Sequence, residues 1–270
     1  MSMIWNAKNG TVKIGSTEMS YVSFGFGKKA LILLPGLSDG LTTVDGKALL
    51  LAAPYQLFFK DYTVFIFSRK KELPDDYSIR EMAADQAEAI SELGIQKASV
   101  LGVSEGGMIA QYLAIDHPGL IEKLVIAVSA PSVNAALRSA LEAWINSAKQ
   151  RNHKRLMIDT AERSYSEAYL KKYRRVYPLI GWIGKPKSYH RFLVNAKAIL
   201  HFDCLEDLKK INCPTLIIGG ETDQVVGPLA SYEMHAQIRG SELYMYQQYG
   251  HAAYEEAADF YKRVFEFLVR

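Results

Sequence analysis

A serine between two glycines is the first group in this sequence that could do chemistry. Ser104 is the central residue of a Gly-x-Ser-x-Gly frame that runs from Gly102 to Gly106. A serine hydroxyl is a weak nucleophile near neutral pH, so it needs a base to take its proton and a carboxylate to orient that base. The sequence should therefore bring a histidine and an aspartate or glutamate within reach of Ser104.

The residues around Ser104 predict a sharp turn from a strand into a helix. Residues 98–103 form a short apolar run typical of a buried strand, and residues 108–115 are typical of a buried helix. This context is that of a nucleophile elbow, in which the helix start faces a developing negative charge. Side chains at positions 102 and 106 would collide with the neighbouring strand and helix. A glycine-rich turn with a capping serine is the alternative interpretation.

Two loops near the C-terminus supply the other groups. Asp223 follows the apolar strand predicted at 214–218, and His251 follows the strand predicted at 242–246. The order Ser104, Asp223, His251 matches one known order of nucleophile, acid and base. The sequence therefore predicts a catalytic triad made of these three residues.

Other carboxylates are candidates for the acid. Glu221 is an alternative, although it lies closer to the strand end than Asp223. Asp203 is better explained as a cap or surface residue. The strand predicted at 124–128 is followed by Ser129 and Ala130, so no acid is available there.

Strand-like and helix-like segments alternate along most of the chain. Strands are predicted at 11–14, 19–24, 30–34, 63–67, 98–103, 124–128, 214–218 and 242–246. Helices are predicted near 47–59, 78–93, 108–115, 229–238 and 253–269, the second opening with a capping box of Ser78 and Glu81. This alternation predicts an α/β fold, with a mostly parallel central sheet covered by helices on both faces.

Residues 131–205 break this pattern because they contain helical periods and no strand-like run. We expect an all-helical cap here, inserted into a core made of residues 1–130 and 206–270. The segment is rich in aromatic residues, Trp182 among them. Tyr165, Tyr169, Tyr173 and Tyr177 recur every four residues, which predicts a stripe on one helix face. The stripe either packs the cap onto the core or lines an apolar pocket.

The charge of the chain is concentrated in the same segment. Residues 131–205 carry fourteen Lys or Arg against five Asp or Glu, a net charge of +9, whereas the rest of the chain carries −6. A solvated outer face is the usual place for such charges. Basic groups that faced inward would favour substrates with an anionic group.

On these motifs, the chain resembles the α/β-hydrolase superfamily, of the kind with a helical cap domain. The resemblance covers nearly the whole chain and rests on the elbow, on residues 214–226, and on Gly250-His251 followed by Glu255. It implies that Ser104 is the nucleophile, His251 the base and Asp223 the acid.

The resemblance also implies an oxyanion hole formed by two backbone N–H groups, those of Leu37 and Glu105. The sequence departs from the family pattern in two places. Pro35-Gly36 stands where many relatives have His-Gly, and only Arg69 remains of an Asp-x-Arg-Gly-x-Gly run. We expect the Glu105 side chain to be solvated at the helix start.

These features predict a serine hydrolase that cleaves an ester or a similar acyl bond through an acyl-enzyme. Serine at the elbow argues against relatives that use aspartate there, such as haloalkane dehalogenases and epoxide hydrolases. Aminopeptidase, C–C bond hydrolase, thioesterase and acyltransferase activities remain open. So does a non-catalytic small-molecule receptor on the same scaffold.

The remaining expectations concern cofactors, partners and location. The other histidines show no shared ligand spacing, so we expect no metal, and we expect no cofactor. We expect a small-molecule acyl substrate and no nucleic-acid partner. The two cysteines, the absence of a visible signal peptide and the lack of any run near the ~20 residues of a membrane span favour a cytoplasmic protein. The sequence indicates no oligomeric state.

Overall fold

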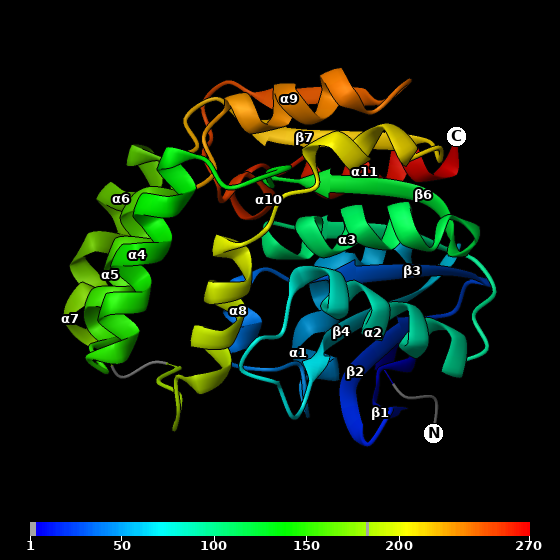
Figure 1. Ribbon diagram of the computed structural model, residues 1–270, viewed down its shortest axis with the longest axis horizontal. Helices are drawn as coiled ribbons and strands as arrows, with labels where there is room; N and C mark the ends of the chain where they lie inside the picture. Colours follow the sequence, from blue (N-terminus) through cyan, green and yellow to red (C-terminus); the bar gives the residue numbers. More distant parts are fainter. Residues whose placement is uncertain (1–3, 182–183) are drawn as a thin grey trace.

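The computed structural model describes residues 4–181 and 184–270. Its centre is an eight-stranded sheet in the order β1-β2-β4-β3-β5-β6-β7-β8 (Figure 1). The strands are β1 (Lys8–Ile14), β2 (Thr17–Gly25), β3 (Lys29–Leu34), β4 (Tyr62–Lys70), β5 (Ala98–Val103), β6 (Ile121–Ala127), β7 (Thr215–Gly220) and β8 (Glu242–Tyr246). The pairings of β1 with β2 and of β2 with β4 are antiparallel, and those from β4 to β8 are parallel. The predicted fold class is confirmed.

Helices cover both faces of this sheet. They are α1 (Ala48–Ala52), α2 (Ile79–Glu92), α3 (Glu105–Asp116), α9 (Leu229–Gln237), α10 (Ala253–Glu256) and α11 (Phe260–Val269). Short 3₁₀ helices are η1 (Ile4–Asn6), η2 (Leu37–Gly40), η3 (Ala53–Phe58), η4 (Pro118–Leu120) and η6 (Leu205–Lys210). Strand side chains alternate between two apolar clusters: Ile32 packs with α2 and α3, and Leu31 packs with α11. Burial on both faces explains why these strands are apolar throughout.

The capping box of Ser78 and Glu81 is present at the start of α2. Two other predicted helices are interrupted in the structure. The helix predicted near 47–59 changes from α to 3₁₀ at Ala53, because Pro54 has no N–H to continue the α-helical pattern. The helix predicted over 253–269 is interrupted at Ala257, whose backbone is extended. The Tyr165 hydroxyl donates to the Glu255 carboxylate of α10, and the Ser166 N–H donates to the Glu256 carboxylate. These bonds connect the short helix α10 to residues 165–166.

Residues 131–205 form helices α4 (Ala135–Lys149), α5 (His153–Ser164), α6 (Glu167–Tyr173), α7 (Tyr177–Ile180) and α8 (His190–Leu200), with η5 at Arg174–Val176. We call these residues the helical segment 131–205; Trp182 lies outside the described residues. In Figure 1, α4 to α7 stand beyond the arrowheads of β6 and β7. Among the described residues, no helix is long and apolar enough to cross a bilayer.

The tyrosine stripe forms, but it does not lie on one helix as predicted. Tyr165 follows α5 in an extended conformation, and Ser166 then caps a new helix by accepting a hydrogen bond from the N–H of Tyr169. The rings still stack, with centroids 4.2 Å apart for Tyr165 and Tyr169 and 4.1 Å apart for Tyr169 and Tyr173. The spacing therefore predicted a shared face correctly and a continuous helix wrongly.

Candidate active site

Ser104 occupies the turn between β5 and α3 in a strained backbone conformation. Its φ is 55° and its ψ is −119°, a conformation that costs a non-glycine residue about 1–3 kcal/mol. The end of β6 holds it in place: the N–H of Ser104 donates to the Ala127 carbonyl at 2.9 Å, and the Ser129 hydroxyl donates to the Ser104 carbonyl at 2.8 Å. The strained turn presents a half-buried hydroxyl at the carboxyl edge of the sheet.

The two glycines of the frame have the steric role that the sequence predicts. A methyl group on Gly102 would lie 2.4 Å from the Gly106 carbonyl oxygen, and one on Gly106 would lie 1.9 Å from the carbonyl oxygen of Leu34. Both contacts are with backbone, which cannot move aside as the end of a side chain can. The elbow therefore packs against β3 at backbone distance.

We expect Gly106→Ala to destabilise the protein by at least about 3 kcal/mol, because the overlap with Leu34 exceeds that of ordinary overpacking. Thermal unfolding measured by circular dichroism would show the loss. Gly119→Ala is a matched control, since a methyl group there meets no atom within 4 Å. Equal unfolding temperatures for the two variants would contradict the close packing of the elbow.

The structure brings Ser104, His251 and Asp223 into one line of contacts. His251 Nε2 lies 2.9 Å from Ser104 Oγ, and His251 Nδ1 lies 2.9 Å from Asp223 Oδ2. The second Asp223 oxygen accepts the N–H groups of Val225 at 2.8 Å and Val226 at 3.0 Å. A proton on Nδ1 that is held by the carboxylate leaves Nε2 free to accept the serine proton.

The loop that carries His251 is fastened to the helical segment 131–205. The N–H of Ala252 donates to the carbonyl of Ser164, the last residue of α5, at 2.9 Å. A methyl group on Gly250 would lie 3.1 Å from the same carbonyl oxygen. Helix α5 therefore ends directly against the histidine loop.

The other candidate acids point elsewhere. The Glu221 carboxylate accepts a hydrogen bond from the Tyr232 hydroxyl. Asp203 is exposed, and its carboxylate accepts the N–H of Leu205 at 3.1 Å. Within residues 4–181 and 184–270, no group of three or more His, Cys, Asp or Glu side chains is placed to hold a metal ion.

The residues predicted for the oxyanion hole lie on segments that border Ser104. A methyl group on Gly36 would lie 3.7 Å from Ser104 Oγ, so the loop 35–40 passes beside the hydroxyl. Leu37 is the first residue of η2 and Glu105 the first residue of α3. The first N–H groups of a helix have no acceptor within that helix, so both can serve an external oxygen.

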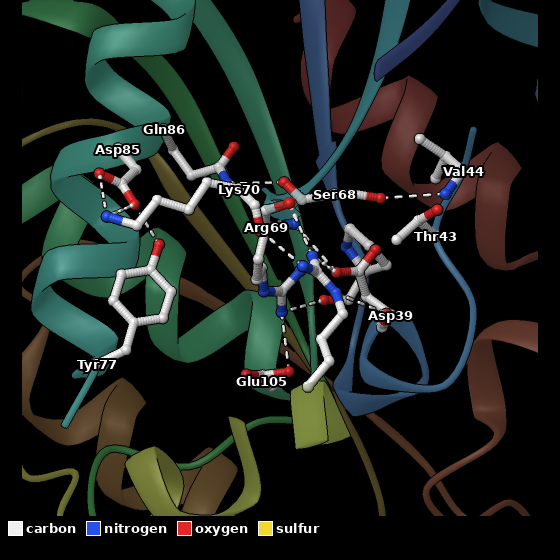
Figure 2. Close-up of polar contacts among 12 residues, drawn as sticks. Asp39, Thr43, Val44, Ser68, Arg69, Lys70, Tyr77, Asp85, Gln86 and Glu105 are labelled. Atoms are coloured by element: carbon white, nitrogen blue, oxygen red, sulfur yellow. Dashed lines mark hydrogen bonds and ion pairs between the residues drawn. The ribbon is translucent and has the colours of Figure 1, made fainter. Parts of the chain in front are cut away.

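The expectation of a solvated Glu105 side chain is wrong. Glu105 is fully buried, and its carboxylate forms an ion pair with Arg69 at 2.9 Å (Figure 2). Burial raises the pKa of the Glu105 carboxyl, and the guanidinium opposes that shift. Arg69 Nη2 also donates to the Pro35 carbonyl at 2.8 Å. Arg69, the residue retained from the family run, thus links the loop 35–40 to the elbow.

The sequence did not predict a role in the site for two residues of this network, Asp39 and Arg191. Asp39 Oδ2 accepts the backbone N–H of Arg69 at 3.0 Å and Arg191 Nη2 at 2.9 Å. Asp39 and Arg191 are 152 positions apart, and a contact over that distance leaves no local pattern to detect. In the sequence, Arg191 is one of many basic residues in the segment 131–205. That excess of positive charge does not distinguish Arg191 from the others.

A cavity of about 340 Å³ opens beside His251, between its loop and the helical segment 131–205. All four tyrosines of the stripe line it, together with Leu170 and Glu255, among others. None of the described residues that line it is Lys or Arg. Twelve of the fourteen basic residues of the segment are exposed, and only Arg163 and Arg191 are half-buried.

Comparisons with known proteins agree with this architecture. Residues 29–258 match the family described as alpha/beta hydrolase fold. Serine hydrolase BPHL of Homo sapiens is 24% identical over 268 residues, covering 94% of this chain and 84% of BPHL. Putative carbamate hydrolase RutD of Escherichia coli O157:H7 (strain EC4115 / EHEC) is 26% identical over 192 residues, covering 67% of this chain and 68% of RutD.

Solved structures show the same fold at low identity. MGS-M2, an alpha/beta hydrolase enzyme from a Medee basin deep-sea metagenome library, has a TM-score of 0.84 at 20% identity over 97% of this chain and 98% of its own. The enol-lactonase from Burkholderia xenovorans LB400 has a TM-score of 0.81 at 20% identity over 97% of this chain and 100% of its own. With the family match over residues 29–258, the sheet order and the strained elbow, these findings show that the chain belongs to the α/β-hydrolase family.

Proposed function

We propose that this protein is a serine hydrolase that cleaves a carboxylic ester, or a similar acyl bond, through an acyl-enzyme. The observation that carries the proposal is the line of 2.9 Å contacts from Asp223 through His251 to Ser104. The buried carboxylate orients the imidazole, and the imidazole accepts the serine proton. The names of the relatives BPHL and RutD, a serine hydrolase and a putative carbamate hydrolase, support hydrolysis of an acyl compound.

Each residue then has a defined step. Ser104 Oγ attacks the carbonyl carbon while His251 Nε2 takes its proton, and the N–H groups of Leu37 and Glu105 donate hydrogen bonds to the developing oxyanion. His251 returns the proton to the leaving alcohol, which departs and leaves the acyl group on Ser104. Water then attacks the acyl-enzyme, with His251 again as the base, and the carboxylic acid is released.

The helical segment 131–205 serves as the cap in this proposal, and the core consists of residues 1–130 and 206–270. The tyrosine-lined cavity beside His251 offers an apolar, aromatic surface for one part of the substrate. The stacked rings of Tyr165, Tyr169 and Tyr173 favour a flat or hydrophobic group.

Labelling with a fluorophosphonate probe tests the proposed function directly. The probe reacts with a serine that a neighbouring base activates, so we expect one phosphonylated peptide that contains Ser104. A non-catalytic receptor on this scaffold, with no activated serine, would remain unlabelled. Esters, lactones, carbamates, thioesters and peptides would then separate esterase activity from the alternatives, and an added alcohol acceptor would reveal acyl transfer.

The cavity lining predicts a preference for neutral substrates. Glu255 borders the cavity and no Lys or Arg does among the described residues, so a carboxylate placed there would meet a like charge. We expect a neutral aryl ester to have a kcat/KM about 10-fold above that of the matched carboxylate-bearing ester, a difference of roughly 1.4 kcal/mol. Parallel assays at low and high salt measure it. A preference for the carboxylate ester would show that basic side chains of the cap reach the substrate.

A further inference from the structure

Arg191 is the one basic residue of the helical segment 131–205 whose described contacts reach the loop 35–40. Its Nη2 donates to Asp39 Oδ2 at 2.9 Å and to the Arg69 carbonyl at 2.7 Å. Its Nη1 donates to the Lys70 carbonyl at 2.6 Å, and its Nε donates to the Asp39 carbonyl at 3.3 Å. One guanidinium on α8 therefore joins the loop 35–40 to the end of β4.

Asp39 is the point in the loop 35–40 where these contacts meet. It lies in η2, two positions after Leu37, and is only 2% exposed. Its N–H donates to the Gly36 carbonyl at 3.1 Å, which closes the turn around Leu37. A displacement of the Asp39 side chain would therefore change the direction of the Leu37 N–H group.

Arg69 holds the opposite side of the same loop. Figure 2 shows the side chains of Arg69, Asp39 and Glu105 converging from β4, η2 and α3. With Arg191, they form a group of two positive and two negative charges, in which the Arg191 side chain is 17% exposed and the other three are at most 1% exposed. Both ion pairs of this group are largely buried, so breaking either one would leave a desolvated charge behind.

Helix α8 also touches the loop 35–40 at backbone distance. A methyl group on Gly40 would lie 2.7 Å from the Cα of Phe192, the residue after Arg191. The loop and the first turn of α8 therefore leave no space between them. A movement of the helix toward the loop must displace η2.

We propose that Arg191 is a positioning residue. Through its contacts, the geometry of the oxyanion hole depends on how α8 packs against the loop 35–40. The proposal rests on the proposed function, which gives the Leu37 N–H its role. Removing one oxyanion donor outright reduces kcat by about 10²- to 10³-fold. Loosening the loop that carries the donor should cost less, about 10- to 100-fold, because Arg69 still holds the other side.

The test compares Arg191→Met with Arg151→Met in the full chain. Arg151 is another arginine of the helical segment, it is exposed, and its Nη2 donates to the Lys187 carbonyl at 3.0 Å. We expect Arg191→Met to lower kcat about 10- to 100-fold with KM within about 3-fold. The affinity for a trifluoromethyl ketone, whose serine adduct carries an oxyanion, should fall by the same factor as kcat/KM. Arg151→Met should match the wild type.

Two further measurements separate positioning from a general loss of structure. Amide hydrogen exchange should quicken in residues 35–41 of Arg191→Met without substrate, while the helices of the core stay protected. Arg191→Lys should recover part of kcat, since an ammonium can pair with Asp39 but cannot serve the three carbonyls. Asp39→Asn should also lower kcat, and its combination with Arg191→Met should lose less than the product of the two single losses, because the two side chains share the contact between Arg191 Nη2 and Asp39 Oδ2.

Several outcomes would overturn the proposal. Wild-type kcat and exchange in Arg191→Met would show that the contacts leave the oxyanion hole unaffected. A rise in KM at unchanged kcat would make Arg191 a substrate contact instead. If Arg191→Met does not fold, Arg191→Lys and Asp39→Asn decide the matter by the same comparison of kcat with exchange. Failure of wild-type protein to react with the fluorophosphonate would refute the proposed function, and the exchange measurement would still test whether Arg191 holds the loop 35–40.

Discussion

Ser104→Ala is expected to abolish ester turnover, with a loss of at least about 10⁴-fold in kcat, while the protein remains folded. The substitution removes the attacking oxygen and leaves the elbow backbone in place. His251→Ala should lose about as much, and the double variant should lose little more, because the two groups act in one step. Initial rates with a chromogenic ester, alongside circular dichroism, measure the effect.

A control for this experiment comes from the same strand. Ser99 is buried near the start of β5, away from the edge that carries Ser104, so Ser99→Ala should retain turnover. Turnover by Ser104→Ala near the wild-type level would exclude an acyl-enzyme on this residue. Strictly additive losses in the double variant would argue against a shared proton transfer.

Asp223→Asn is expected to lower kcat by about 10⁴-fold, nearly as much as loss of the nucleophile. An amide has nearly the shape of the carboxylate and can still accept the N–H groups of Val225 and Val226, so the fold should survive. It cannot stabilise the imidazolium, and it no longer fixes the proton on Nδ1 of His251.

Glu221→Gln is the matched control for Asp223→Asn. Both acids lie in the loop after β7, but the Glu221 carboxylate bonds to Tyr232, so its variant should keep kcat within about 2-fold of the wild type. The reverse result, a large loss for Glu221→Gln and a small one for Asp223→Asn, would make Glu221 the acid of the site. Steady-state kinetics on both purified variants decides between them.

The sequence predicted the sheet and the meeting of Ser104, Asp223 and His251 for a simple physical reason. Each of these residues follows an apolar run, and the carboxyl ends of parallel strands meet at one edge of a sheet. Residue order and strand endings therefore bring together side chains that lie 28 and 147 positions from His251. Their catalytic roles rest on the chemistry of that arrangement and await the experiments above.

The buried ion network could not be predicted in the same way. A glutamate at a helix start is usually solvated, and only the tertiary position of Arg69 makes Glu105 a buried ion. The partnership of Asp39 with Arg191 depends on how α8 packs, which no local pattern encodes. The tyrosine stripe shows the same limit, because a cap formed by Ser166 divides one apparent helical period between two helices.

The backbone of Ser104 has a consequence for how this protein can evolve. At a φ of 55°, glycine would be the relaxed choice, so Ser104→Gly should recover part of the roughly 1–3 kcal/mol of strain. Selection for folding alone would then favour a glycine at position 104, and only selection for hydrolysis keeps the serine there. In a descendant that no longer needed the hydrolase activity, the single substitution Ser104→Gly would give a more stable and inactive protein. At this position, a gain in stability costs the activity.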